Sequence, residues 1–210
     1  INAFINYIML NFHIYYETKV KPFNLNHFSA KKGYFDGYWQ SYKYFDDIKE
    51  TLRNEIVLKK IDSKIQSLST KINQSNSVSV HIRKSDYTST KNSKIYADCS
   101  PNFYINCMNY FMKKYSSVFF YVFSDDFDWV KKNIDLKKYP NKFIHNSQEE
   151  DLVLMSSCKH NIISNSTFSW WAAYLNKNTK KEVICPMNWF NPTFIEKFDI
   201  YPENWIIFKN

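Results

Sequence analysis

The sequence predicts an α/β fold in which residues 75–210 form a doubly wound domain, a parallel sheet with helices on both faces. Two observations predict it. Segments typical of strands alternate with segments typical of helices, as in chains built from strand–helix–strand units. Residues 118–123, reading VFFYVF, are apolar without a break, as expected of a strand that is buried on both faces.

The first 74 residues are expected to form a separate region ahead of this domain. Near the start of the chain, apolar side chains recur every three or four positions, which indicates a helix. From Asp46 the sequence predicts one long helix, because Asp47 and Glu50 have the spacing of a capping box. An apolar stripe near helical period supports this helix: Ile48, Leu52, Ile56, Ile61, Ile65 and Leu68. The polar run 69–77 is expected to be a loop.

Local signals place the elements of the downstream domain. Ser100 and Pro101 are the residue types preferred at a helix N-cap and at the first helical position, and Ser147 with Glu150 forms a second capping box. Helices are therefore expected from residue 101, over 127–133, from about 147 to 157 and over 167–175. Strands are expected over 77–82, 118–123, 142–145, 161–164, 182–185 and 205–208.

The composition argues against several classes of function. The net charge is +8, but Lys, Asn, Ile, Tyr and Phe are abundant throughout and Arg is scarce, which indicates a compositional bias rather than a basic patch. Since the chain has neither a clustered basic stripe nor a nucleic-acid motif, no nucleic-acid partner is expected. With two glycines in the whole chain, a P-loop or a G-x-G-x-x-G turn is disfavoured, whereas a nucleotide is not.

The cysteines and the ends of the chain bear on location. None of the four cysteines has the spacing of a zinc site or a redox dithiol, so Cys107 and Cys158 are expected in the core and a reducing compartment fits best. No signal peptide is evident, and no apolar run approaches the roughly 20 residues that span a bilayer. Because the chain begins at Ile1 rather than Met, we expect a fragment. The expected location is cytoplasmic, with peripheral association at the inner face of the membrane allowed by the basic charge.

Three polar clusters follow three of the predicted strands. They read HIRKSD at 81–86, SDD at 124–126 and SNST at 164–167. The carboxyl ends of parallel strands lie at one edge of a sheet, and ligands of open α/β sheets bind in the crevice outside that edge. We therefore expect the three clusters to meet in one crevice.

The first two clusters suggest anion and ribose recognition. Arg83 offers a planar fork of donors that suits a pyrophosphate, although an ion pair with Asp86 is the alternative. His81 alternates with apolar residues and is more typical of a satisfied core histidine. Asp125 and Asp126 could hold a ribose or a base edge, or one of them could cap the next helix. The two acids are adjacent rather than separated by one residue, which weakens a metal-site interpretation.

The third cluster opens a predicted helix. Free backbone N–H groups and the helix dipole favour an anion beside Ser166 and Thr167, and either Asn165 or Ser166 could instead serve as an N-cap. The aromatic residues that follow are expected to pack in the core: Trp170, Trp171 and Tyr174. Asp151 precedes an apolar run and could face solvent or a nucleotide base.

Together these segments resemble a known enzyme family. HIRKSD at 81–86 is similar to the H-x-R-R-x-D motif of the α-1,2- and α-1,6-fucosyltransferase superfamily, and YVFSDD at 121–126 resembles its second motif. Residues 151–175 are very similar to the third motif of the bacterial α-1,2-fucosyltransferases of glycosyltransferase family 11. Residues 37–45 match a segment ahead of that family's donor domain. The resemblance runs from about residue 33 to the end, and the third motif is long and specific.

The resemblance implies a GT-B fold, with a Rossmann-like GDP-fucose-binding domain at 75–210 and a remnant of the acceptor domain with a linking helix at 1–74. It implies inversion at the fucose carbon, no metal and no other cofactor. Arg83 would hold the β-phosphate of GDP, and His81 with Asp151 would face the guanine. Asp125 or Asp126 would contact the nucleoside or order the loop. Phosphate and ribose contacts would come from the last cluster: Asn165, Ser166, Thr167 and Phe168.

Two departures from the family pattern matter. Lys84 replaces the second arginine of the motif, which keeps the charge and loses the planar fork. The family's N-terminal Gly-Gly-x-Gly-Asn-Gln-type loop is missing, so most of the acceptor domain is expected to be absent.

The expected function is the inverting transfer of L-fucose from GDP-fucose to the 2-hydroxyl of a galactoside, in a cell-surface glycan with terminal galactose. Asp86 is a candidate for the general base by its chemistry alone, and it could instead orient Arg83. The alternatives are a GT-B glycosyltransferase with a different nucleotide sugar, a fragment that binds GDP without catalysis, and a nucleic-acid-binding module.

Overall fold

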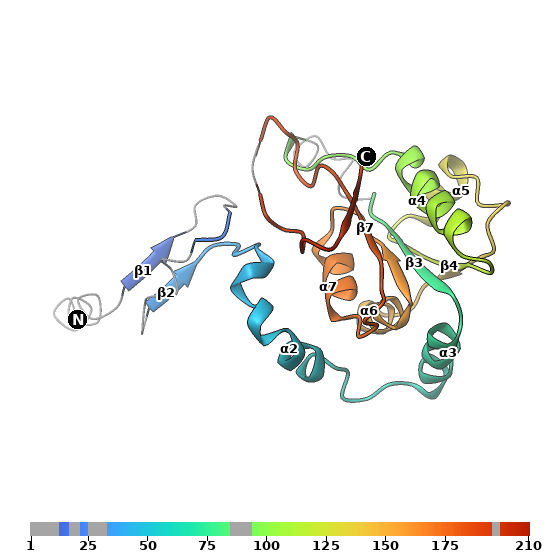
Figure 1. Ribbon diagram of the computed structural model, residues 1–210, viewed down its shortest axis with the longest axis horizontal. Coiled ribbons are helices and arrows are strands. Elements are labelled where there is room, and N and C mark those ends of the chain that lie inside the picture. The colour runs from blue at the N-terminus through green and yellow to red at the C-terminus, as the bar shows by residue number, and fades with distance from the viewer. Residues whose placement is uncertain (1–12, 17–21, 25–32, 85–93, 195–197) are drawn as a thin grey trace. The chain divides into compact units, whose positions relative to one another are not determined.

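The computed structural model describes residues 13–16, 22–24, 33–84, 94–194 and 198–210. The chain separates into two compact units, one made of Ile1–Ile48 and Ile195–Glu203, the other of Lys49–Phe194 and Asn204–Asn210 (Figure 1). These units are defined by packing, and the division into acceptor-side and donor-side domains at residue 75 stays a prediction.

The second unit is built on a six-stranded sheet with the order β5-β4-β3-β6-β7-β8. Every neighbouring pair in it is parallel. The chain starts in the middle of the sheet, runs outward to one side, and then crosses back to fill the other side. The order therefore reverses between β3 and β6, as in Rossmann folds. The strands are β3 (Ser77–Ile82), β4 (Phe119–Ser124), β5 (Asn141–Ile144), β6 (His160–Ile162), β7 (Val183–Pro186) and β8 (Ile206–Phe208).

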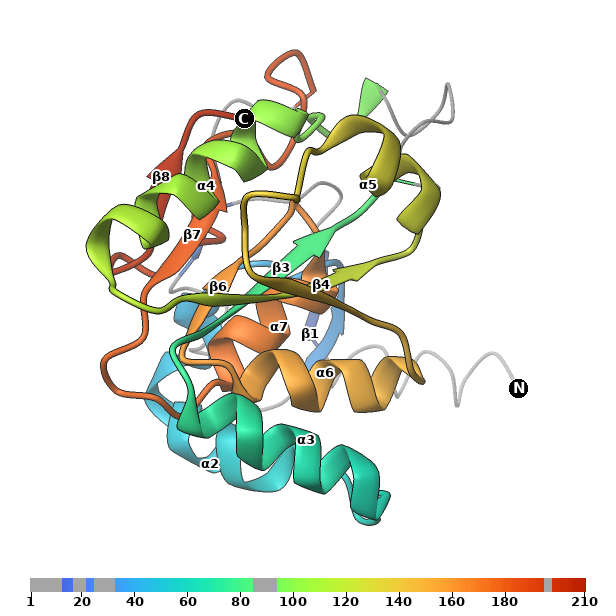
Figure 2. The ribbon, with the colours of Figure 1, turned by 90° about the vertical axis from the view of Figure 1, so that its right-hand side faces the viewer.

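Helices cover both faces of this sheet, so the predicted α/β architecture with a parallel sheet is confirmed (Figure 2). On one face, α4 (Pro101–Lys114) and α5 (Phe127–Asn133) pack against alternate side chains of the central strands. On the other face lie α3 (Ser63–Gln74), α6 (Gln148–Ser157) and α7 (Thr167–Leu175). Each fully buried Phe or Leu in these two clusters contributes about 2 kcal/mol.

The capping signals at Ser100 and Ser147 are confirmed, whereas Asp47 lies within a 3-10 helix and does not cap the helix predicted there. Ser100 accepts a hydrogen bond from the backbone N–H of Phe103 at 3.3 Å and begins α4. Ser147 and Glu150 form both hydrogen bonds of a capping box at the start of α6, at 3.3 and 3.1 Å. Cys107 and Cys158 lie in the core as predicted, and all four cysteines are buried free thiols.

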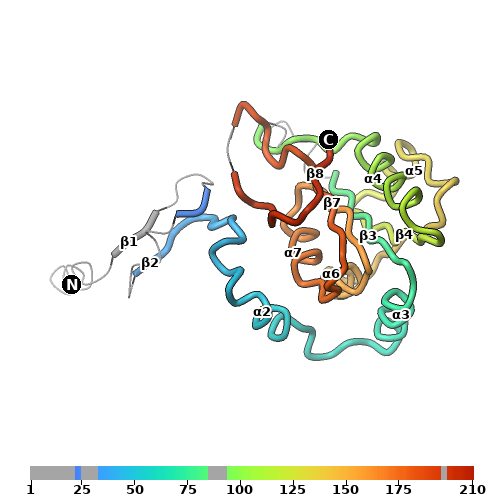
Figure 3. The backbone as a smooth tube through the Cα atoms, viewed as in Figure 1, coloured from blue at the N-terminus to red at the C-terminus, as the bar shows by residue number. Residues whose placement is uncertain are grey.

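The single long helix predicted from Asp46 is wrong. The chain instead forms two short 3-10 helices, η2 (Tyr42–Tyr44) and η3 (Asp46–Ile48), and then the helix α2 (Lys49–Glu55). A connector of residues 56–62 separates α2 from α3 (Figure 3). Asp62 caps α3 by accepting from the N–H of Lys64 at 2.7 Å, which fixes a new helix start.

The prediction of a loop over 69–77 is also wrong, because most of this run is helical. Helix α3 continues to Gln74, and β3 begins at Ser77. Thr70 satisfies its hydroxyl by donating to the carbonyl of Gln66 within the helix, at 2.9 Å. Such local bonds let polar residues remain in a helix that packing elsewhere stabilises.

The central strand β3 carries polar side chains on the face that α6 and α7 cover. Asn161 of β6 donates to the Ser79 hydroxyl at 2.7 Å, and Asn176 donates to the Asn161 side-chain oxygen at 2.9 Å. These groups are buried, so each hydrogen bond offsets a desolvation cost. His81 continues the same face of β3 and leads to the carboxyl edge of the sheet.

The first unit contains a two-stranded parallel sheet of β1 (His13–Tyr16) and β2 (Gly33–Asp36). Asp199 organises it by accepting from the N–H of Phe23 at 3.0 Å and pairing with Lys43 at 3.6 Å. The helix expected near the start of the chain lies mostly outside the described residues, and the part that is described, residues 13–16, forms the strand β1.

Candidate functional site

The carboxyl ends of β3 and β6 lie next to each other where the strand order reverses. Val80 and Ile162 are register partners, so the chain leaves the two strands at neighbouring points of the edge. The Nδ1 atom of His81 is 3.0 Å from Oγ of Ser164, a hydrogen bond that ties the first polar cluster to the third. Ligands of doubly wound sheets bind at this kind of reversal point.

Arg83 is held by Asp125. Its Nε is 3.2 Å from one carboxylate oxygen, and the backbone N–H of Lys84 donates to the other at 2.9 Å. Both side chains are largely withdrawn from water, with 34% of Arg83 and 17% of Asp125 exposed. The first and second polar clusters therefore meet, and the ion pair restrains the guanidinium at this edge of the sheet.

Hydrogen bonds of the Ser124 hydroxyl hold the turn after β4 in place. The Ser124 hydroxyl donates to the carbonyl of Ile82 at 2.9 Å and accepts from the N–H of Asp126 at 3.0 Å. Asp126 caps α5 by accepting from the N–H of Trp129 at 2.8 Å. Of the two adjacent acids, Asp126 thus serves the helix, as the capping alternative predicted, and Asp125 serves the arginine.

Lys84 is turned inward rather than toward solvent. It is 4% exposed, its Nζ pairs with the Asp98 carboxylate and stands 4.3 Å above the ring centre of Trp129. Its charge is therefore used inside the protein. The sequence did not single out Asp98 or Trp129, because neither lies in a recognisable motif.

Burial keeps His81 neutral. The side chain is 4% exposed, and desolvation lowers its pKa to about 4, with Arg83 acting in the same direction and Asp125 opposing it. The ring of Phe168 packs edge-on against the imidazole, with 5.5 Å between ring centres. A neutral imidazole bound through Nδ1 to Ser164 has a fixed orientation at this edge.

The residues of the third cluster, 164–167, have different roles at the start of α7. Ser166 is the N-cap of α7 but makes no side-chain capping bond, and Thr167 is exposed at the first helical position. The helix start therefore presents backbone N–H groups and the positive end of its dipole. Asn165 is not a cap. It donates to the carbonyls of Ala97 and Trp189, at 2.6 and 3.0 Å, and so ties two loops to the end of β6.

Asp151 is not joined to this group by the contacts of the described residues. Within the described part of the chain, Asp151 bonds its own loop, accepting from the Asn146 side-chain amide at 2.9 Å and backbone N–H at 3.4 Å. Burial raises the pKa of its carboxyl, and these bonds oppose that effect. Asp86 lies outside the described residues.

The aromatic residues of α7 behave as predicted. Trp170 and Tyr174 are buried and stack with 4.8 Å between ring centres. Trp171 packs edge-on against Trp170 at 5.2 Å and is partly exposed. These rings fix α7 in the domain and with it the position of its N-terminus.

Within the described residues, every helix is too short or too polar to cross a bilayer.

Comparison with known proteins places the chain among glycosyltransferases. The family model described as Glycosyl transferase family 11 matches residues 2–209. An α-1,2-colitosyltransferase of Escherichia coli is 40% identical over 177 residues, which are 82% of this chain and 61% of the relative. The O-antigen biosynthesis glycosyltransferase WbnK of Escherichia coli is 35% identical over 62% of this chain and 44% of its own.

More distant relatives are animal enzymes. A galactoside α-(1,2)-fucosyltransferase 1 of Aotus azarae is 28% identical over 66% of this chain and 42% of the relative. The chain thus spans between 42% and 61% of the length of these three relatives. No solved structure matches it significantly. Because the family model covers nearly the whole sequence, the chain belongs to glycosyltransferase family 11.

Proposed function

We propose that the protein to which this chain belongs transfers L-fucose from GDP-fucose to the 2-hydroxyl of a terminal galactose in a cell-surface glycan, as an inverting galactoside 2-α-L-fucosyltransferase. One observation carries the proposal. In a chain of this family, Arg83, held by Asp125, lies at the edge where the sheet reverses its strand order. The names of the relatives support α-1,2 transfer of a sugar of this kind.

The proposed chemistry is a displacement at the fucose anomeric carbon. The acceptor hydroxyl attacks from the face opposite GDP and forms the new C–O bond. The bond from that carbon to the β-phosphate oxygen breaks, and its electron pair stays on the leaving phosphate. Arg83 and the N-terminus of α7 stabilise the charge that develops there. The hydroxyl proton goes to a base, for which Asp86 is the candidate.

The nucleotide would lie along the same edge. His81 and Asp151 would face the guanine, a neutral ring and a carboxylate that accepts from the base N–H groups. Asp125 or Asp126 would contact the nucleoside or order the loop that carries Arg83. Phosphate and ribose contacts are proposed for Asn165, Ser166, Thr167 and Phe168. Cation side chains and helix amides supply the positive charge in this proposal, so no metal is required.

The rest of the proposal concerns the whole protein. We propose a GT-B arrangement in which residues 1–74 are the remnant of an acceptor-side domain, because the chain spans 61% or less of these relatives. The acceptor would then be chosen mainly outside this chain. We also propose a cytoplasmic location with peripheral association at the membrane surface.

A second donor is favoured by one observation. The relative that is 40% identical is an α-1,2-colitosyltransferase, so a nucleotide-activated colitose is an alternative to GDP-fucose. Turnover of the two donors with one galactoside acceptor, at equal concentration, separates the two. A preference for the colitose donor of more than about tenfold, or about 1.4 kcal/mol, would replace fucose in the proposal.

Nucleotide titration tests the donor site directly. Tryptophan fluorescence of the chain should show saturable binding of GDP, weaker binding of UDP, and loss of affinity in Arg83→Ala. EDTA should leave both binding and turnover unchanged. Equal affinity for UDP and GDP would overturn the proposal that the site recognises guanine. Binding of GDP without turnover of GDP-fucose on any galactoside would assign this chain to the inactive-fragment alternative.

A further inference from the structure

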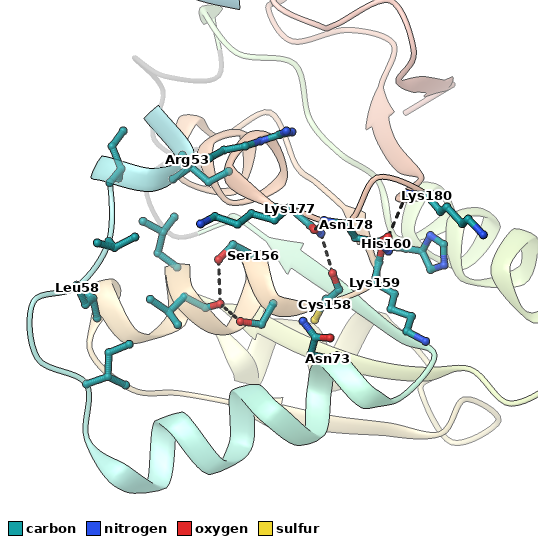
Figure 4. A pocket seen from close by; sticks show the side chains of 18 of the residues that line it. Arg53, Leu58, Asn73, Ser156, Cys158, Lys159, His160, Lys177, Asn178 and Lys180 are labelled. Carbon is teal, nitrogen blue, oxygen red and sulfur yellow. Dashed lines mark hydrogen bonds between the residues drawn. The ribbon is translucent and has the colours of Figure 1, made fainter. Parts of the chain in front are cut away.

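A concave region lies at the edge of the same sheet opposite the candidate donor site. A pocket of about 660 Å³ opens where the strands begin, and its walls come from the connector 56–62 and from the ends of α3, α6 and α7 (Figure 4). His160, the first residue of β6, lines it, whereas the candidate donor site follows the last residue of β6. Its volume is within the range of about 300–1,000 Å³ that is typical of ligand pockets.

One end of the pocket is aliphatic and exposed. Ile56, Val57 and Ile61 of the connector line it and leave 45%, 58% and 39% of their surfaces in water. Leu152 and Val153 of α6 extend the same wall. Single exposed apolar residues are ordinary, but three in one connector that also line a pocket are typical of a surface that is covered in use.

The pocket is also cationic. Arg53, Lys159, Lys177 and Lys180 line it, and no carboxylate does among the residues described. The Nζ of Lys177 donates to the Asn54 side chain at 3.0 Å, and its side chain extends toward the α2 end of the pocket. Lys159 and Lys180 lie near the other end in Figure 4 and form no ion pair in the described part of the chain.

Two of the nearby charges are already satisfied. Arg53 donates to the carbonyl of Tyr174 at 3.1 Å and pairs with Glu50 at 2.6 Å, so it mainly serves the end of α7. Asp62, the acid within the connector, accepts from the N–H of Lys64 as the cap of α3. The three lysines that line the pocket are therefore the charges left to meet an anionic partner.

We propose that this edge docks on a membrane surface rich in anionic phospholipid. The connector aliphatics would enter the boundary between headgroups and acyl chains, while Lys177 and Lys180 contact lipid phosphates through long side chains whose stems tolerate apolar surroundings. The combination of exposed aliphatics with lysines that form no ion pair among the described residues favours an anionic amphiphile over a small soluble anion. The inference names the surface for the proposed membrane association and does not depend on which sugar is transferred.

Vesicle co-sedimentation of the full chain tests the surface. The chain should bind vesicles of phosphatidylglycerol mixed with phosphatidylcholine more tightly than pure phosphatidylcholine vesicles, and salt should weaken the binding. Each cation near an anionic bilayer contributes about fivefold to partitioning, so Lys177→Ala combined with Lys180→Ala should lower the partition coefficient by about 25-fold. Val57→Asp, at an exposed position, should lower it by about tenfold or more.

A matched control separates this surface from the overall charge. Lys131→Ala combined with Lys132→Ala removes the same charge from exposed positions on α5, on the other face of the sheet, and should change partitioning by less than about threefold. If both double variants lowered the partition coefficient equally, this edge would not be the docking surface, although the chain would still associate with membranes. Absence of vesicle binding, displacement of the chain by millimolar inorganic phosphate, or a dimer in sedimentation velocity that Val57→Asp abolishes would each overturn the inference.

Discussion

The two edges of one sheet differ in how their charges are arranged. At the carboxyl edge the cations are matched, Arg83 by Asp125 and the buried Lys84 by Asp98. At the amino edge, lysines line an open pocket with no carboxylate among the described residues of its wall. The difference teaches that motifs and pockets are separate signals, because the pocket of about 660 Å³ lies at the edge opposite Arg83 and Asp125.

Pairing at the carboxyl edge has a mechanistic consequence. A guanidinium held in place needs little reorganisation when a phosphate arrives, and preorganised donors contribute more to transition-state stabilisation than mobile ones. Lys177 and Lys180 of the amino edge are exposed and form no ion pair among the described residues, which suits a fluid surface of many phosphates better than one bound group. The predictions below test whether the two edges are as different as this.

The largest effect is expected from the arginine of the carboxyl edge. Arg83→Ala in the complete enzyme should lower kcat by about 100-fold or more, because loss of one such donor typically costs about 3–4 kcal/mol. The matched control is Arg53→Ala at the amino edge, where kcat measured at a temperature that keeps the fold should stay within about threefold. If kcat fell by a similar factor in both variants, the two edges would not differ in their contribution to catalysis.

A histidine at each edge gives the next test. The pKa of His81 is about 4 in the folded chain, below its usual value of 6.5, so the unfolded chain binds a proton that the folded chain does not. Stability is complete above pH 6.5 and falls as the pH drops toward 4. Between pH 7 and pH 5 this histidine should cost about 2 kcal/mol of unfolding free energy.

Urea unfolding of His81→Gln at pH 7 and pH 5 measures that contribution. The variant should lose less stability than the parent over this interval. The control is His160→Gln at the amino edge, where burial lowers the pKa of the imidazole but Glu182 opposes the shift. It should flatten the pH dependence less. An unchanged slope in His81→Gln would contradict the view that this ring is neutral because it is buried.

The acid that holds the arginine should have a smaller effect. Asp125→Ala removes the partner of Arg83 Nε and of the Lys84 N–H, and we expect kcat to fall about tenfold, or about 1.4 kcal/mol, since Arg83 itself remains. Asp125→Asn keeps an acceptor and should recover part of the rate. A rise in KM for the donor, with kcat unchanged, would mean that Asp125 contacts the nucleoside rather than positioning the arginine.

The smallest effect is expected from its neighbour. Asp126→Ala removes the cap of α5 and should cost about 1 kcal/mol of stability, which lowers Tm by about 2–4 °C in a chain of this size. GDP affinity should not change. Asp126→Asn should restore Tm, because Asn caps helices as well as Asp. Weaker GDP binding in Asp126→Asn would instead give both acids of the pair a ligand role.

Much of the fold could be read from the sequence. Ser100, Ser147 and Glu150 marked helix starts correctly, and the unbroken apolar run of 118–123 marked a strand buried on both faces. The long helix from Asp46 failed because an apolar stripe near helical period does not say whether a neighbour exists to cover it. Ile56 and Ile61 fit that stripe and yet lie exposed in a connector.

The sequence predicted that the three polar clusters meet at one edge of the sheet, but not which contacts each residue makes there. The motif pointed equally to Asp125 and Asp126, and the structure separates them by which partner each reaches. Asn165 was a candidate cap, but Ser166 is the N-cap of α7, and the Asn165 side-chain amide donates to carbonyls of two loops. Asp98 and Trp129, which enclose Lys84, carry no local signal that could have revealed them.

The sequence by itself determined the alternation of strands and helices, the helix caps and the family, because these depend on side chains within a few positions of one another. Tertiary structure alone decided which carboxylate holds Arg83, where the chain breaks between α2 and α3, and that a pocket forms at the amino edge. Those outcomes depend on distances between segments tens of residues apart, and packing sets such distances only when the whole domain has formed.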